Sequence, residues 1–131
     1  MILLDTHVWL WWLHDPEKLS ARARETLETG EARGALRVSA ISVWEIAVKV
    51  EIGKLKLPME IQRWYEVAST ERPLVVEPLV PSDLIASTRL PGTFHRDPAD
   101  RIIVAVARRY SAPLVTRDGK LLDYPHVETI W

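Results

Sequence analysis

The chain has 131 residues, of which 47% are hydrophobic and 27% are charged, and 17 basic against 18 acidic residues give a formal net charge of −1. This composition and length predict one globular domain that spans residues 1–131. The absence of cysteine excludes a disulfide scaffold, a thiolate metal site and a cysteine nucleophile, so a metal ion can be held only by acidic or histidine side chains.

The sequence pattern argues against a membrane-spanning protein and against a secreted one. No apolar run approaches the roughly 20 residues that a helix needs to cross a bilayer, and the N-terminal residues lack the basic and long apolar segments of a signal peptide. We therefore expect a cytoplasmic protein with no membrane partner. The near-neutral charge gives no basic footprint, so charge alone does not indicate a nucleic-acid partner.

The first half of the chain alternates between short apolar segments and helix-like segments. Ser20 and Ser42 are typical helix N-caps, and Gly30 is a typical helix end. These patterns predict strands at 2–4 and 36–39, an apolar tryptophan-rich segment at 7–13, and helices at 21–29, from 42 to just before Gly53, and from 58 to about 69.

The second half gives a clearer pattern. Asp97 followed by Pro98 is a typical helix start, because aspartate caps a helix and proline fits its first position. Short apolar strands that alternate with helices predict βαβ crossovers, and hence an α/β domain with a mostly parallel central sheet and helices on both faces. The predicted elements are strands at 73–76, 113–116 and 127–131, and helices from 82 to about 91 and at 98–110.

Four acidic residues occupy equivalent places in this predicted topology. Asp5 and Asp118 follow strands, whereas Glu45 and Asp100 lie in the first turns of helices. Because crossover helices start from the carboxyl ends of parallel strands, all four acids are expected at one edge of the sheet, where open α/β folds bind ligands. Carboxylates that meet in this way repel one another unless a cation lies between them, and Mg²⁺ and Mn²⁺ prefer oxygen ligands. The sequence therefore predicts a site for one or two such ions, which could act on a phosphate group.

Each of these acids also has an ordinary structural interpretation. Glu45 follows Ser42 at the spacing of a capping box, and Asp100 in a first helical turn complements the helix dipole. Asp97 is either an N-cap or a group that orients a metal ligand, and Asp118 precedes a glycine, as in a plain turn. The convergence of the four acids carries the metal-site prediction.

Four sequence motifs follow one another along nearly the whole chain. They are LLDTH at 3–7, SVWEI at 42–46, HRDPADR at 95–101 and LVTRD at 114–118. In this order, and in a chain of this length, they resemble the motifs of PIN-domain proteins, specifically the VapC-type toxins of bacterial and archaeal toxin–antitoxin pairs.

The resemblance implies a PIN-like domain that is a metal-dependent endoribonuclease, neutralised by a cognate antitoxin whose helical tail covers the active-site groove. It also implies a homodimer that can enter a larger toxin–antitoxin assembly, with RNA as the substrate and Mg²⁺ or Mn²⁺ as the cofactor. The catalytic and metal-binding residues that it implies are Asp5, Glu45, Asp100 and Asp118, with Thr6, Asp97 and Thr116 beside them.

Aromatic and basic residues supply further candidates around this site. Trp9, Trp11 and Trp12 follow Asp5 closely, and they either pack in the core or form a groove for a partner. No pair of histidines has the spacing of zinc ligands. Basic residues that flank the acids could hold RNA phosphates or be solvated charges; they are Arg96, Arg101, Arg117 and Lys120.

Two other functions fit parts of the sequence. A phosphoryl-handling domain such as a response-regulator receiver needs adjacent acids after its first strand and a late lysine, whereas Asp5 stands alone and Arg117-Asp118 takes the place of the lysine. A non-catalytic partner-binding α/β module would use the tryptophan-rich segment as its interaction helix and the acids as caps and turns. Such a module is expected to bind no divalent ion at the sheet edge.

Overall fold

The computed structural model describes all residues from Met1 to Trp131. Its strands are β1 (Ile2–Leu4), β2 (Leu36–Ser39), β3 (Val75–Glu77), β4 (Leu114–Val115) and β5 (Thr129–Ile130). They form one sheet in the order β3-β2-β1-β4-β5, and every pair of neighbours is parallel. The prediction of an α/β domain is confirmed, and the sheet is wholly rather than mostly parallel.

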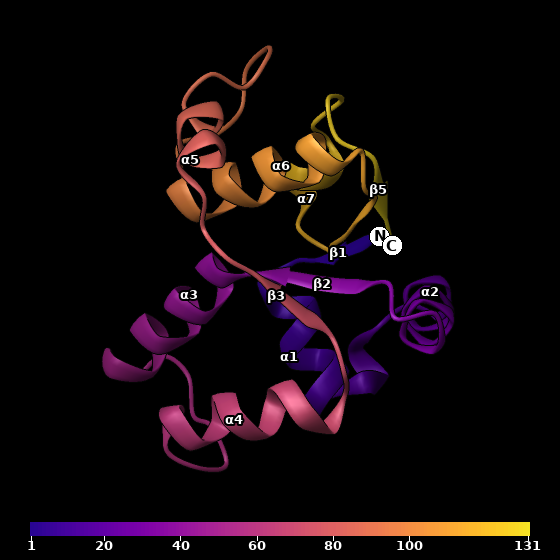
Figure 1. The fold of residues 1–131 in the computed structure, drawn as a ribbon, viewed down its shortest axis with the longest axis vertical. Helices are drawn as coiled ribbons and strands as arrows, with labels where there is room; N and C mark the ends of the chain where they lie inside the picture. Colours follow the sequence, from indigo (N-terminus) through magenta and orange to yellow (C-terminus); the bar gives the residue numbers. More distant parts are fainter.

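Helices cover both faces of this sheet, as predicted. They are α1 (Thr6–His14), α2 (Ala21–Ala32), α3 (Ala40–Glu51), α4 (Ile61–Glu71), α5 (Pro81–Ser87), α6 (Pro98–Tyr110) and α7 (Gly119–Leu122), with a 3-10 turn η1 at Pro16–Lys18. Figure 1 shows α5, α6 and α7 on one side of the sheet and α1, α2 and α4 on the other. None of the helices combines the length and the apolar character that crossing a bilayer requires.

Two hydrophobic clusters fill the space between the sheet and these helical layers. Successive residues of β1 serve both clusters, because side chains alternate across a strand. Leu4 packs with α1 and α4, whereas Leu3 packs with α6. Trp9 and Trp64 meet edge to face in the first cluster with ring centroids 5.2 Å apart, and Ile103 is fully buried in the second. Packing on both faces thus fixes β1 and the residue that follows it.

Helix α2 is longer than predicted. It continues through Gly30 to Ala32, and Gly30 is buried against the sheet. A Cβ added at Gly30 would lie only 2.6 Å from Leu36 Cδ2, so the glycine allows the helix to approach β2 closely. The other predicted elements are present with bounds shifted by up to a few residues, and the short helix α7 has no counterpart among them.

The strand order reverses at β1. The chain passes from β1 to β2 and β3 on one side, and then places β4 and β5 on the other side of β1. In open α/β sheets, ligands bind outside the carboxyl ends of the strands at such a switch point. The topology therefore directs attention to the residues that follow β1 and β4.

Candidate active site

Asp5 lies at the switch point, directly after β1. It is only 4% exposed and is the N-cap of α1. Its Oδ1 accepts a hydrogen bond from the Thr6 backbone N–H at 2.8 Å, and its Oδ2 accepts one from Thr116 Oγ1 at 2.8 Å. Because Thr116 directly follows β4, this second bond joins the ends of the two strands between which the strand order reverses.

Helix α3 brings Glu45 to the same edge. Its Oε1 accepts a hydrogen bond from Thr6 Oγ1 at 2.6 Å, and Thr6 Oγ1 lies 2.7 Å from Ser42 Oγ. Since the threonine hydroxyl donates its one proton to Glu45, Ser42 is the donor in the second contact. The capping-box interpretation is wrong, because the N-cap of α3 is Ser39, whose Oγ accepts from the Ile41 N–H at 3.2 Å. Sequence reasoning took Ser42 only as a helix start; its position three residues before Glu45, on the same helix face, is the signal that could have marked it.

Asp100 enters the site from the first turn of α6. Asp97 Oδ1 accepts a hydrogen bond from the Asp100 N–H at 3.1 Å, so the N-cap role predicted for Asp97 is confirmed. The Asp100 side chain is 15% exposed, and its Oδ2 lies 2.9 Å from His95 Nε2. That ring nitrogen is buried and has no hydrogen-bond partner, so His95 is a close neighbour of Asp100 at this edge of the sheet.

Asp118 completes the group from the segment after β4. Its Oδ1 accepts a hydrogen bond from the Lys120 N–H at 2.8 Å, which makes it the N-cap of α7. Its own N–H donates to Thr116 Oγ1 at 3.0 Å. Thr116 therefore contacts both Asp118 and Asp5. We refer to Asp5, Glu45, Asp100 and Asp118 as the acidic quartet.

Burial raises the pKa of three members of the acidic quartet, and repulsion between the acids acts in the same direction. Burial raises the pKa of Asp5, against the opposing effect of its hydrogen bonds from Thr116 and from the backbone. Burial also raises the pKa of Glu45. For Asp100, burial is the largest cause, and the charges of Asp97 and the rest of the quartet help to raise the pKa to about 7. No lysine or arginine forms an ion pair with any member of the quartet.

The acidic quartet fits a hard divalent cation. Glu45 Oε2, Asp100 Oδ1 and Asp118 Oδ2 have no hydrogen-bond partner in the protein. Mg²⁺ and Mn²⁺ favour such carboxylate oxygens and keep several water molecules as further ligands. No three acidic or histidine side chains already form a coordination shell, so the carboxylates must rotate towards an ion in order to bind it.

The basic residues predicted to contact RNA fall into two groups. Three of them are exposed and form no ion pair, namely Arg96, Arg117 and Lys120. Arg101 differs, because its Nε donates to the Ser87 carbonyl at 2.8 Å and its Nη1 donates to the carbonyls of Phe94 and His95 at 3.1 and 3.2 Å. These bonds engage Nε and Nη1, so the Arg101 guanidinium fixes the segment before α6, and its contact with RNA stays a prediction.

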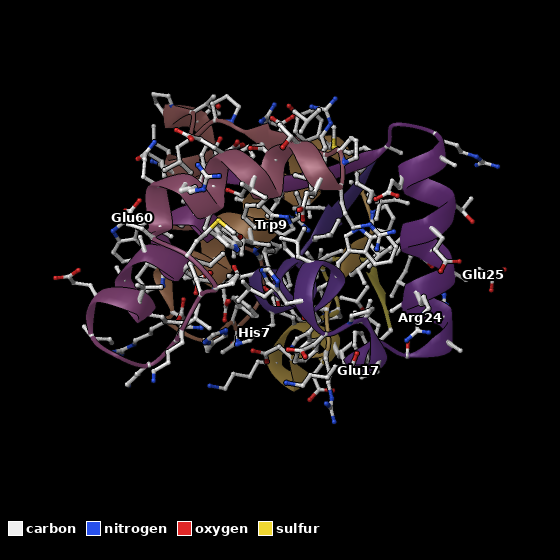
Figure 2. All side chains as sticks on the ribbon, turned by 90° about the horizontal axis from the view of Figure 1, so that it is seen from below. His7, Trp9, Glu17, Arg24, Glu25 and Glu60 are labelled. Carbon is white, nitrogen blue, oxygen red and sulfur yellow. The ribbon has the colours of Figure 1, made fainter.

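The tryptophan-rich segment forms α1. Trp9 and Trp12 are 0% and 2% exposed, so the predicted partner groove is wrong for these two residues, which pack in the core. Figure 2 shows Trp9 inside the molecule, where it packs between α1 and α4. The Arg72 guanidinium covers the Trp12 ring at 3.6 Å. Only Trp11 is partly exposed, and it lines a surface hollow.

Sequence comparison relates the chain to a known family over its full length. The PIN-domain family model matches residues 2–127. Ribonuclease VapC22 of Mycobacterium tuberculosis is 35% identical over 133 residues, which cover 99% of this chain and 98% of that relative.

Solved structures share the fold at lower sequence identity. VapBC2 from Rickettsia felis, bound to a DNA fragment from its promoter, matches with a TM-score of 0.70 at 18% identity, over 99% of this chain and 98% of that one. FitAcB from Neisseria gonorrhoeae matches with a TM-score of 0.67 at 22% identity, over 100% and 97% of the two chains. A toxin–antitoxin complex from Klebsiella pneumoniae matches with a TM-score of 0.67 at 18% identity, over 100% and 97%. The match of the family model and the full-length relative together establish that the chain belongs to the PIN-domain family.

Proposed function

We propose that this protein is a Mg²⁺- or Mn²⁺-dependent endoribonuclease that acts as the toxin of a toxin–antitoxin pair. The observation that carries the proposal is the acidic quartet, which lies at the switch point of a PIN fold without a lysine or arginine to neutralise it. The full-length relative named a ribonuclease and the structural neighbours named as toxin–antitoxin complexes support the same function. The domain extends over residues 1–131, because β5 lies beyond residue 127 and pairs with β4. We place the activity in the cytoplasm, with RNA as the substrate.

The residues of the chain hold and orient the acids. Thr116 fixes Asp5, and Thr6 fixes Glu45, so each carboxylate is held by a threonine hydroxyl. Asp97 caps α6 and thereby sets the position of Asp100. One or two ions bound by the quartet would supply Lewis-acid stabilisation of charge on a phosphodiester and lower the pKa of the attacking water. The exposed Arg96, Arg117 and Lys120 are the side chains that we assign to RNA phosphates.

Cleavage of RNA by the purified protein, freed of any antitoxin, tests this function. We expect cleavage with Mg²⁺ or Mn²⁺ and none in excess chelator. Asp5→Asn should abolish cleavage while circular dichroism and thermal unfolding show an intact fold. Glu66→Gln, which alters an exposed acid on α4, is the matched control and should cleave as the wild type does. Cleavage that persists in excess chelator would refute the proposal.

The antitoxin site that we propose is the hollow beside α1. It measures about 390 Å³, and its lining includes His7, Trp11, Lys18 and Leu57. His7 is two residues from Asp5, so a segment that fills this hollow can reach the acidic quartet and exclude RNA. The apolar lining residues and the two lysines, Lys18 and Lys56, favour an antitoxin segment with apolar and acidic side chains.

Trp11→Ala tests the antitoxin site. Loss of a partly buried tryptophan from an interface typically weakens binding by more than about 1 kcal/mol, or about fivefold. We expect the Kd for the antitoxin to rise at least that much, whereas Leu122→Ala, at an exposed position outside this hollow, leaves it unchanged. Equal Kd values for Trp11→Ala and the wild type would place the antitoxin elsewhere.

Self-association is the remaining part of the proposal. Trp44 and Ile52 of the α3 region are each 57% exposed, and exposed apolar side chains of this size are typical of contact surfaces. We infer that the outer face of α3 takes part in a homodimer, which can join a larger assembly with the antitoxin. Sedimentation of the wild type as a dimer and of Trp44→Glu as a monomer is expected; a wild-type monomer at all concentrations would contradict it.

A further inference from the structure

We propose that a second hollow, next to the acidic quartet, binds a nucleobase of the RNA substrate beside the phosphate that is cleaved. This inference rests on the proposed ribonuclease function and assigns to it a base-recognition pocket. The hollow measures about 430 Å³, a size typical of small-ligand sites. The lining residues used in the argument are Thr93, Phe94, His95, Lys120, Asp123 and Tyr124.

The position of this base pocket follows from two residues that belong to both sites. His95 lines the pocket, and its Nε2 lies 2.9 Å from Asp100 Oδ2. Lys120 also lines it, and its backbone N–H donates to Asp118 Oδ1 at 2.8 Å. The pocket therefore borders two of the four acids. A nucleotide whose phosphate lies at the quartet would have its base within reach of the pocket.

Aromatic rings form one wall of the base pocket. The ring centroids of Phe94 and His95 are 4.4 Å apart, and those of Phe94 and Tyr124 are 4.6 Å apart. Phe94 and His95 are partly exposed, whereas Tyr124 is 4% exposed and donates its hydroxyl to the Pro91 carbonyl. Proteins that read single-stranded RNA stack unpaired bases on such rings. The wall thus suits an unstacked base.

Polar groups around the ring wall match the rest of a nucleotide. Lys120 is exposed and forms no ion pair, so its ammonium group is available for a phosphate. Asp123 is likewise exposed and unpaired, and its carboxylate can only accept hydrogen bonds. An acceptor at this place favours a base that presents an amino group over uracil, whose one donor on the base, N3–H, lies between two carbonyl oxygens that repel the carboxylate.

The base pocket is preformed by contacts with the start of α6. Arg101 Nη1 donates to the carbonyls of Phe94 and His95 at 3.1 and 3.2 Å, and its Nε donates to the Ser87 carbonyl at 2.8 Å. These bonds fix the backbone of the ring wall before any ligand arrives. Preorganisation of this kind reduces the entropy that binding must overcome. The residue after Asp100 thus links the acid site to the pocket.

A cycle of paired changes in enzyme and substrate tests the base pocket. The substrates are a short RNA with one mapped cleavage site and two copies of it in which the nucleotide on either side of the cleaved bond is abasic. The enzymes are the wild type, Phe94→Leu, Asp123→Asn and the control Glu66→Gln. For the wild type, we expect kcat/KM to fall about 5- to 150-fold at one of the two abasic positions, the range that stacking of one base produces.

If the pocket binds the base, the effects on kcat/KM of the protein substitution and of base removal will not add. Phe94→Leu should lower kcat/KM on the intact RNA and have little further effect on the RNA that lacks the bound base, whereas Glu66→Gln changes neither. Asp123→Asn, at an exposed position, should do the same more weakly and serves where Phe94→Leu is unfolded by circular dichroism. Equal effects of these variants on intact and abasic RNA, or no effect of either abasic position, would overturn the proposal.

A binding measurement separates the pocket from the ribonuclease function. We would titrate the ¹⁵N-labelled full chain with AMP, GMP, CMP and UMP and follow the amide resonances. The pocket predicts shifts clustered at 93–95 and 120–125 that weaken in Phe94→Leu or Asp123→Asn, with UMP the weakest ligand. Absence of such shifts would overturn it. Failure to cleave any RNA, with these shifts present, would refute the ribonuclease function alone.

Discussion

Two groups of buried or half-buried acids in this molecule differ in whether an arginine neutralises them. Asp83 and Glu77 are 2% and 5% exposed, as deeply buried as Asp5, yet each is paired with arginine. Arg109 donates two hydrogen bonds, of 2.7 and 2.9 Å, to the Asp83 carboxylate, and Arg37 forms an ion pair with Glu77. The acidic quartet has no such partner. Burial of an acid therefore does not mark a functional site by itself, whereas burial without a lysine or arginine partner makes the acid a candidate for one.

The two groups also differ in what they connect. The arginine-paired acids, Glu77 and Asp83, join the edge strand β3 to β2, α5 and the end of α6. They tie elements together on the side of the molecule where the sheet would otherwise present a free edge. In the acidic quartet, by contrast, the charges of neighbouring acids repel one another. We conclude that the arginine-paired acids stabilise the fold and that the acidic quartet binds a metal ion.

The largest effect is expected on RNA cleavage, which should be lost in a variant of the acidic quartet and kept in a variant of the arginine-paired acids. Asp100→Asn should lower kcat/KM about 100-fold or more, because the lost stabilisation of phosphate charge is worth several kcal/mol. Asp83→Asn, assayed where it is folded, should stay close to the wild type. The measurement is RNA cleavage at saturating Mn²⁺. Comparable losses in both variants would erase the distinction between the groups.

The free energy of unfolding should fall in Asp83→Asn and rise in Asp100→Asn, whereas cleavage activity is lost only in the second variant. Asp83→Asn removes the carboxylate that Arg109 binds most closely and leaves Glu77, 3.9 Å away, as its acidic partner. We therefore expect the free energy of unfolding to fall by about 1–3 kcal/mol; the 36% exposure of the arginine moderates the loss. Asp100→Asn should instead stabilise the metal-free protein at pH 8, since it removes a repelled charge. Urea unfolding of both variants checks the signs. A destabilised Asp100→Asn would contradict the account.

The difference in stability between Asp100→Asn and the metal-free wild type should depend on pH. The pKa of Asp100 rises from 3.8 to about 7, so between these values the folded protein holds a proton that the unfolded chain releases. The contribution of this group is fully present below about pH 4 and is lost as pH rises through about 7. We expect Asp100→Asn and the metal-free wild type to have similar Tm values at or below about pH 4, and the variant to become the more stable as pH rises to about 8. A gap that narrows towards pH 8 would be inconsistent with this pKa.

The smallest effect on activity is expected for RNA binding, and it contrasts the exposed arginines beside the acidic quartet with an exposed arginine at the end of α2. Arg96→Ala and Arg117→Ala should each weaken RNA binding by a similar factor for all sequences and reduce the slope of log K against log salt by about one. Binding is measured in the Asp5→Asn background, which prevents cleavage. Arg33→Ala, at the exposed end of α2, is the control. An unchanged salt slope in both variants would remove them from the RNA surface.

The convergence of the quartet could be predicted from sequence because it follows from topology. Each acid stands at a strand end or helix start, and a parallel sheet brings such places to one edge. The roles of Ser42 and Arg101 could not be predicted, since both depend on contacts with segments far away in the chain, Thr6 and Ser87. A typical helix-end signal at Gly30 was misleading for the same reason: the packing partner that requires a glycine lies on β2.

The arginine-paired acids also depend on contacts between segments far apart in the chain, which the local sequence does not predict. Asp83 and Arg109 are 26 positions apart, and Glu77 and Arg37 are 40 apart. Nothing in the local pattern distinguishes these acids from solvated ones, because the pairing is created only when α5 and β3 come to lie beside α6 and β2. The sequence pattern therefore predicts the acids that have no lysine or arginine partner, and it does not distinguish those that an arginine neutralises.

Titration of Mn²⁺ into the metal-free protein, followed by calorimetry, tests whether the acidic quartet binds a metal ion. We expect saturable binding by the wild type and by folded Asp83→Asn, and loss of that binding in Asp100→Asn with its fold intact. A wild type that binds no Mn²⁺, or an Asp100→Asn variant that binds it equally well, would contradict the assignment of the unneutralised acids to a metal ion.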